Sequence, residues 1–156
     1  MLKLLLLVFG GVIMNYKSIS AKFFARGQAE GRALVTDQSL CFWGGLDPKT
    51  GIIIETGHPL EGENITGKVL VFPRGHGSSS SSGVLLEAVR CNHAPAAIIN
   101  IFCEPIIATG SIVAKALYGK SVPIAVISEE DFKSIRQDSV LRLDDEEKKI
   151  TVLKKI

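Results

Sequence analysis

The sequence has few of the residues that build disulfide and metal frameworks, since its 156 residues include only three cysteines. Cys41, Cys91 and Cys103 form no CxxC pair, follow no regular spacing and are odd in number, which argues against a disulfide framework. The same spacing argues against structural zinc or an iron–sulfur cluster held by this chain alone. We therefore expect a protein of a reducing compartment, the cytoplasm, that binds no metal or cofactor of its own.

An excess of charge of one sign is also missing. The 18 basic and 16 acidic residues give a net charge of +2, and no basic stripe interleaved with aromatic residues occurs, so no nucleic-acid partner is expected. The apolar run Leu2–Ile13 is too short to span a bilayer, and no membrane partner is expected. We expect residues 1–14 to be an apolar N-terminal extension without functional weight, while secretion or anchoring stays the alternative.

The remaining residues, 15–156, have the apolar content of one domain with a real core, and their pattern changes partway along the chain. Strands are predicted first, at Ser18–Ala25, Arg32–Thr36 and Gly51–Glu55, with the polar stretch Arg26–Gly31 as a hairpin or corner. Strands and helices then alternate: strand Val69–Phe72, helix from about Ser80 to Asn92, strand Ala96–Asn100, helix from about Ile106 to Tyr118, strand Val122–Ile127, a short helix capped by Ser128 and ending near Gln137, and a terminal hairpin of Val140–Leu143 with Lys149–Leu153. This order predicts an α/β fold in which an antiparallel N-terminal β layer joins a small parallel sheet covered by helices.

The segment Lys68–Arg90 organises the rest of the chain. It joins a buried strand to an amphipathic helix through Gly75, Gly77 and the five consecutive serines Ser78–Ser82. Glycine allows positive φ and a close approach of the backbone, and a helix N-terminus presents unpaired N–H groups and the positive end of the helix dipole. The segment therefore suits a bound carboxylate or phosphate, or an alkoxide forming on a serine.

Other interpretations of this segment are weaker. A P-loop needs a lysine directly before its hydroxyl residue, and no lysine occurs between Lys68 and Lys115. A flexible Gly/Ser linker is the bland alternative, but strand and helix patterns bracket the tract without any spacer. Two further residues stay open: Trp43, beside two glycines, either lines a cavity or belongs to the core with Phe42, and His58 is interpreted as a surface loop histidine.

Several motifs occur together in an order that is typical of one family. They are Phe42-Trp43-Gly44-Gly45-Leu46-Asp47-Pro48, Gly67-Lys68-Val69-Leu70-Val71-Phe72-Pro73, Gly75-His76-Gly77-Ser78-Ser79 and Ala94-Pro95-Ala96-Ala97-Ile98-Ile99. From about Ala29 to Ile127 the chain resembles the aconitase X swivelling-domain family, which includes the small subunits of phosphomevalonate dehydratases. The resemblance implies a swivelling β/β/α fold and a heterodimer with a large catalytic subunit that carries the iron–sulfur cluster.

The resemblance also implies a reaction and its site. Family members dehydrate a small hydroxy acid, either mevalonate 5-phosphate to trans-anhydromevalonate 5-phosphate or cis-3-hydroxy-L-proline. Ser78 occupies the position of the serine that acts as general base, and His76, Gly77, Ser79 and Gly45 are the expected substrate-binding residues. Position 76 is histidine where the family pattern has arginine or lysine, so a positive charge there depends on pH.

Two alternatives of other classes stay open. The stretch Ala108–Leu117 followed by Val122–Val126 resembles the motif of phosphohistidine carrier domains, but Ile112 stands where that motif needs a histidine. A noncatalytic or regulatory binding module that lacks a large partner is the other alternative.

Overall fold

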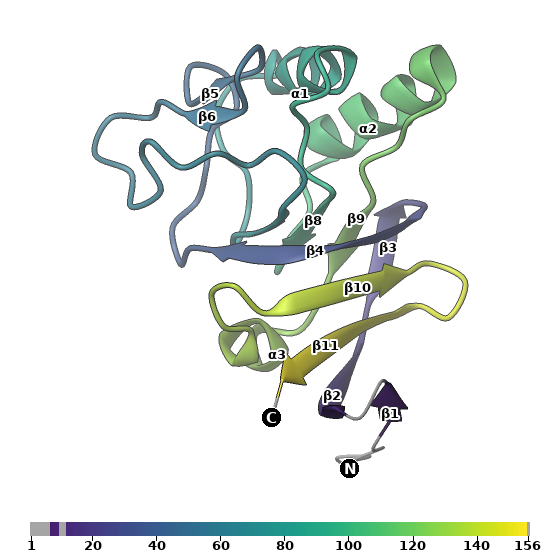
Figure 1. Cartoon of the computed structure of the whole chain (residues 1–156). Coiled ribbons are helices and arrows are strands. Elements are labelled where there is room, and N and C mark those ends of the chain that lie inside the picture. The colour runs from purple at the N-terminus through teal and green to yellow at the C-terminus, as the bar shows by residue number, and fades with distance from the viewer. Residues whose placement is uncertain (1–6, 10–11, 156) are drawn as a thin grey trace.

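The protein has three layers, two of β-sheet and one of helices (Figure 1). The computed structural model describes residues 7–9 and 12–155. The strands are β1 (Leu7–Phe9), β2 (Val12–Ser20), β3 (Lys22–Ala25), β4 (Gln28–Val35), β5 (Leu46–Asp47), β6 (Ile52–Ile53), β7 (Val69–Val71), β8 (Ala97–Asn100), β9 (Ile124–Val126), β10 (Val140–Asp144) and β11 (Lys149–Lys155). The helices are α1 (Ser81–Arg90), α2 (Pro105–Tyr118) and α3 (Glu129–Ser134).

One long strand, β4, connects the two β layers. The nine-stranded order is β1-β2-β11-β10-β4-β7-β8-β9-β3. Residues 28–32 of β4 pair antiparallel with β10, whereas residues 33–35 pair parallel with β7. Strands β7, β8 and β9 continue the parallel sheet, and β3 closes its edge antiparallel to β9. The predicted α/β swivelling fold is confirmed, with the C-terminal hairpin completing the antiparallel layer.

The parallel strands are buried on both faces, which explains their unbroken apolar sequence. Side chains alternate along a strand, so Val69 and Val71 of β7 join the core between the two sheets, together with Leu141 and Leu143 of β10. Leu70 points to the opposite face and joins the core beneath the helices. Each face buries a separate hydrophobic cluster, and together they hold the three layers in contact.

The structure corrects several predicted boundaries. The predicted strand Gly51–Glu55 is only β6, which pairs with β5 in a separate two-stranded sheet and leaves Glu55 in the following loop. The run Ser18–Ala25 is two strands, because the chain breaks at Ala21, whose N–H donates to the Lys148 carbonyl, and each part pairs in a different layer. The polar stretch Arg26–Gly31 is only partly a corner, since residues 28–31 belong to β4. Their polar side chains face solvent there, as the ion pair of Glu30 with Arg142 on β10 shows (2.8 Å).

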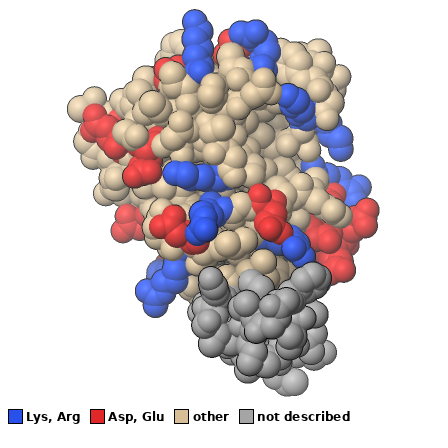
Figure 2. All heavy atoms as spheres, in the orientation of Figure 1, with Lys and Arg blue, Asp and Glu red and all other residues tan. Residues whose placement is uncertain are grey.

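Part of the expected extension 1–14 lies outside the described residues, namely 1–6 and 10–11. Strand β2 already begins at Val12, and Met14 pairs with Lys155 of β11. Among the described residues, no helix is both long enough and apolar enough to cross a membrane. On the face in Figure 2, basic and acidic side chains are interspersed.

Two glycines in the helical layer should respond oppositely to alanine. A Cβ on Gly110 of α2 would lie 2.6 Å from the Ser82 carbonyl oxygen of α1, whereas a Cβ on Gly83 of α1 meets no atom within 4 Å. We expect Gly110→Ala to lower the free energy of unfolding by about 1–3 kcal/mol because the helices must separate. Gly83→Ala should raise it by about 0.5–1 kcal/mol through helix propensity. Urea unfolding of the isolated chain measures both, and equal effects would contradict the close contact.

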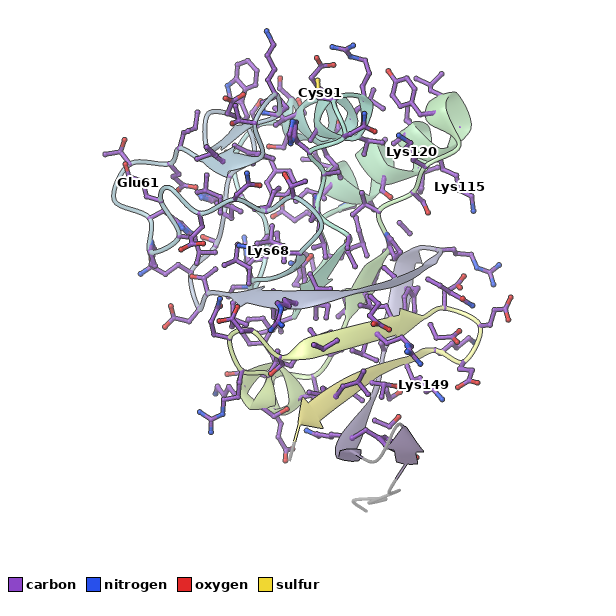
Figure 3. The ribbon with its side chains drawn as sticks, viewed as in Figure 1. Glu61, Lys68, Cys91, Lys115, Lys120 and Lys149 are labelled. Atoms are coloured by element: carbon purple, nitrogen blue, oxygen red, sulfur yellow. The ribbon has the colours of Figure 1, made fainter. Side chains whose placement is uncertain are left out.

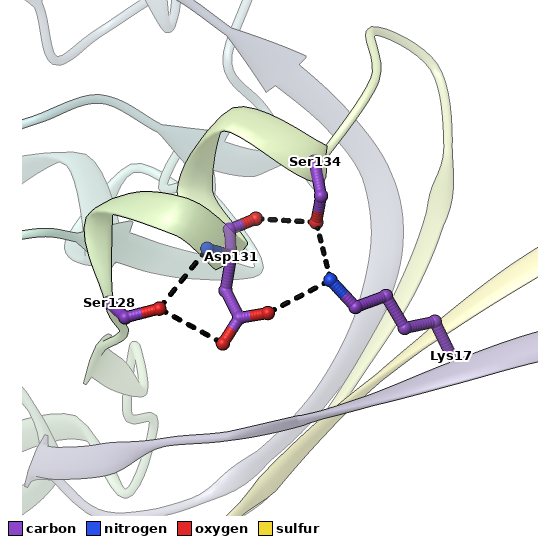
Figure 4. A network of polar contacts seen from close by, with 4 residues as sticks. All are labelled: Lys17, Ser128, Asp131 and Ser134. Carbon is purple, nitrogen blue, oxygen red and sulfur yellow. Dashed lines mark hydrogen bonds and ion pairs between the residues drawn. The ribbon is translucent and has the colours of Figure 1, made fainter. Parts of the chain in front are cut away.

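Helix α3 is fixed to β2 by a polar network (Figure 4). Lys17 Nζ donates to Asp131 Oδ1 at 2.8 Å and to Ser134 Oγ at 2.9 Å. Ser128 is the N-cap, as predicted, and its Oγ accepts the Asp131 N–H (3.1 Å). The helix ends at Ser134, short of the predicted Gln137. The hydrogen bond from Lys17, and then the one from Ser128, lower the pKa of Asp131 below its usual 3.8.

This shift predicts an acid-sensitive contribution to stability. Because the folded-state pKa of Asp131 is depressed, its contribution is present above the unfolded value of 3.8 and is lost as the pH falls through the folded pKa. At neutral pH, Asp131→Asn should lower the free energy of unfolding by about 1 kcal/mol. The difference from wild type should shrink as the pH falls below 3.8 and should vanish once the pH is below the folded-state pKa, measured by urea unfolding across the pH range. A difference independent of pH would contradict an ionic role.

Candidate functional site

The loops that follow β4 and β7 meet at one edge of the parallel sheet, above the ends of the strands. Leu40 and Gly75 form a parallel bridge, with the Leu40 N–H donating to the Arg74 carbonyl (3.4 Å) and the His76 N–H donating to the Leu40 carbonyl (3.2 Å). In open α/β sheets, ligands bind outside the carboxyl ends of the strands. The sequence-predicted site residues therefore gather where this rule expects a site.

Gly77 lies directly against Cys41. Its φ is +93°, and a Cβ at this position would lie 2.5 Å from Cys41 Sγ. The Cys41 thiol is itself fixed, since Sγ donates to the Trp43 carbonyl oxygen at 3.0 Å. A side chain at position 77 would therefore be excluded both by the backbone conformation and by the contact with Cys41.

The serines form a turn that leads into α1. Ser78 and Ser79 are exposed, Ser80 is the N-cap and Ser81 begins the helix, as predicted. The Ser80 N–H donates to Ser78 Oγ at 3.1 Å. Within the described part of the chain, the N–H groups of Gly77, Ser78 and Ser79 have no hydrogen-bond acceptor. The turn thus presents a hydroxyl group and free backbone donors to the outside, which suits a developing negative charge.

Behind the turn lies a carboxylate that the sequence did not single out. Glu55 Oε2 accepts the Cys41 N–H (3.1 Å), and Glu55 Oε1 lies 3.5 Å from His76 Nε2. Gly45 makes room for it, because a Cβ there would lie 3.0 Å from Glu55 Oε2 and 2.0 Å from the Cys41 carbonyl oxygen. The structure therefore places Gly45 beside Glu55, behind the turn rather than on its exposed side.

The sequence left open whether Trp43 lines a cavity or belongs to the core with Phe42, and the structure places the two residues differently. Phe42 is fully buried in the core, whereas Trp43 is 59% exposed. Trp43 borders an open hollow of about 480 Å³ whose other lining residues are Pro48, Ser80, Ser82, Gly83, Val84 and Glu87. The Trp43 N–H donates to Ser81 Oγ at 3.1 Å, and Ser81 is buried. The five serines are therefore not equivalent, because Ser81 has a structural role.

Two other residues are structural. The interpretation of His58 as a surface residue is wrong, since it is buried, its Nδ1 accepts the Leu60 N–H (3.0 Å) and its Nε2 lies 3.2 Å from the Ser39 carbonyl oxygen. Ser111, of the carrier-like stretch, is buried in α2 and bonds both polar groups of the Val122 backbone. That stretch is a helix followed by a strand, as the sequence favoured.

The three cysteines lie in different surroundings. Cys41 contacts Gly77, Cys91 lies at the outer end of α1 beside Glu87 (Figure 3), and Cys103 is buried. Burial raises the pKa of the Cys103 thiol to about 11, which disfavours the thiolate that binds metals. No group of three or more metal-binding side chains is found among the described residues.

The two β layers, the helical layer and the serine turn at the sheet edge define a swivelling β/β/α domain. The aconitase X swivel domain family model matches residues 18–152. The chain is 40% identical over 133 residues to the phosphomevalonate dehydratase small subunit of Methanothermobacter thermautotrophicus, covering 85% of this chain and 97% of that one. The chain belongs to the aconitase X swivel domain family.

Two further relatives show how the domain occurs elsewhere. It is similar to Thermococcus kodakaraensis aconitase X, with a TM-score of 0.79 and 33% identity over 88% of this chain and 98% of the other. It is also 44% identical over 103 residues to the cis-3-hydroxy-L-proline dehydratase of Pseudomonas aeruginosa, covering 66% of this chain but only 18% of that enzyme. The domain is thus a small part of some relatives and nearly the whole of others.

Proposed function

We propose that this chain is the small subunit of an aconitase X-type hydro-lyase and that Ser78 is its general base. The family membership and the relatives named as dehydratases support the reaction class. One observation carries the role of Ser78: its exposed hydroxyl oxygen already accepts a backbone N–H, that of Ser80, at 3.1 Å. A hydrogen bond to the charged form favours that form, so this contact helps the oxygen to exist as an alkoxide.

The reaction needs little more from this chain than a positioned base. Ser78 Oγ takes a proton from the carbon next to the hydroxyl-bearing carbon, and the electron pair of that C–H bond forms the C=C bond as the C–O bond breaks. The proton and the hydroxide together leave as one water per turnover. Free N–H groups at Gly77 and Ser79 offer hydrogen bonds to a substrate carboxylate or to the alkoxide.

The proposed substrate is a small hydroxy acid, mevalonate 5-phosphate or cis-3-hydroxy-L-proline. The names of the relatives support both. We would combine the chain with a large aconitase X-type subunit and assay both acids by the appearance of the unsaturated product. Turnover of either acid supports the proposal, whereas a stable complex inactive on both would favour a noncatalytic module.

The iron–sulfur cluster is proposed to reside in the large subunit, because the three cysteines of this chain have different neighbours and Cys103 is buried. We expect the isolated chain to fold, to purify without stoichiometric iron and to show no dehydratase activity. Adding the large subunit should restore activity and protect the surface around Trp43 from solvent. Metal analysis and hydrogen exchange measure these outcomes, and one iron or more per isolated chain would contradict this assignment.

A further inference from the structure

The Glu55 carboxylate is a charged group that connects three loops at the site. Its own loop follows β6, Cys41 belongs to the loop after β4, and His76 belongs to the loop after β7. Its two oxygens lie 3.1 Å from the Cys41 nitrogen and 3.5 Å from His76 Nε2, and the side chain is only 27% exposed. A carboxylate of this kind fixes the relative position of the loops that it contacts.

Both partners of Glu55 lie next to Gly77, the residue that precedes Ser78. Cys41 packs against Gly77, the residue before Ser78, so closely that no Cβ fits between them. His76 is the other neighbour of Gly77, and its Nε2 is buried without a hydrogen-bond partner in the described part of the chain. At 3.5 Å the carboxylate is just beyond hydrogen-bond distance, but it is the acidic group that faces this nitrogen. Glu55 therefore constrains the serine turn through two contacts, one with Cys41 and one with His76.

We propose that Glu55 is a positioning residue for the reaction of Ser78. Glu55 acts through its neighbours: it holds Cys41 against Gly77 and faces the His76 ring, and so it sets the direction of the Ser78 hydroxyl. A displacement of a reacting group by about 1 Å can cost about 10²-fold in rate. The proposal rests on the proposed function of Ser78 for its kinetic part, but its structural part stands on the contacts alone.

The kinetic test compares two matched carboxylates in the reconstituted complex. Glu61 lies at the outer edge of the same loop (Figure 3), and its Oε2 likewise accepts one backbone N–H, from Gly57 (2.8 Å). We expect Glu55→Ala to lower kcat by about 10- to 100-fold with KM within about threefold, and Glu61→Ala to leave both nearly unchanged. Equal effects of the two substitutions would overturn the proposal.

Two conservative variants, Glu55→Gln and His76→Gln, separate the effect of the Cys41 contact from that of the His76 contact. Glu55→Gln keeps an acceptor for the Cys41 N–H but loses the charge that faces His76, so it should retain more activity than Glu55→Ala. If the turnover that Glu55→Gln still loses depends on His76, then His76→Gln should lower kcat by a smaller factor in the Glu55→Gln background than in wild type. Additive losses would contradict the coupling. Should Glu55→Ala fail to fold, the Glu55→Gln and His76→Gln cycle still decides.

A spectroscopic measurement on the isolated chain keeps this proposal separate from the function of Ser78. We expect the backbone amide signals of Cys41, Gly77 and Ser78 to shift in the ¹H–¹⁵N spectrum of Glu55→Gln, and not in that of Glu61→Gln. Unshifted Gly77 and Ser78 signals would overturn the positioning role whether or not the complex is active. If the signals shift but the wild-type complex is inactive, the positioning role of Glu55 stands and the proposed reaction is wrong.

Discussion

Replacing Ser78 with alanine is expected to lower the turnover of the reconstituted complex by about 10²–10⁴-fold, while substrate affinity changes far less. The change removes the oxygen that would take the carbon-bound proton. It should leave the fold and partner binding nearly intact, because Ser78 is exposed and only the Ser80 N–H loses an acceptor. Steady-state kinetics on the substrate found in the activity screen, together with calorimetric titration of the partner, measure the two effects.

Ser82 provides the matched control for Ser78. It has the same side chain four residues later, and its Oγ donates only to the Ser79 carbonyl oxygen (2.9 Å). Ser82→Ala should therefore cost little turnover. Ser81 is unsuitable as a control because its buried hydroxyl accepts the Trp43 N–H. Comparable activity of the Ser78→Ala and Ser82→Ala complexes would show that Ser78 is not the base.

The parts of the fold that depend on local pattern were predictable. The apolar run at β7 forecast a strand buried on both faces, and Gly119, with φ of +67°, ends α2 where the sequence placed its C-terminus. The break at Ala21 was not predictable, since apolar residues continue on both sides of it. Only the pairing of β2 with β11 and of β3 with β9 divides that run.

The candidate site shows the same limit. The serine turn was predictable because its glycines, its serines and the helix pattern that follows are close in sequence. Glu55 carries no such signal, because it stands in a polar loop with Glu61 and its importance comes from a contact with Cys41 across 14 residues. His58 was misjudged for the same reason: its buried ring contacts the Ser39 carbonyl, 19 residues away. Contacts of this range arise only once the loops are folded together.

The second large effect is expected at Gly77. Alanine there would adopt a φ of +93° and place its Cβ 2.5 Å from Cys41 Sγ, so the loop that carries Ser78 must move. We expect Gly77→Ala to lower turnover by about 10²-fold in the complex. Gly44 is the control: its φ of +74° imposes a similar backbone strain, but a Cβ there meets nothing within 4 Å. Gly44→Ala should cost about 1–2 kcal/mol of stability and little turnover.

A second substitution tests whether the contact with Cys41 causes the loss. Cys41→Ala removes Sγ and leaves Cβ, which lies 3.6 Å from the Cβ that alanine would add at position 77, an ordinary contact distance. The double variant Gly77→Ala, Cys41→Ala should therefore recover about tenfold of the lost turnover, because only the backbone strain remains. The measurement is kcat of the two single variants and of the double variant. A recovery in the double variant shows that positions 41 and 77 are energetically coupled. If Cys41→Ala instead deepens the loss, Cys41 supports the serine loop through more than its contact with Gly77, and steric exclusion is not the reason for glycine at this position.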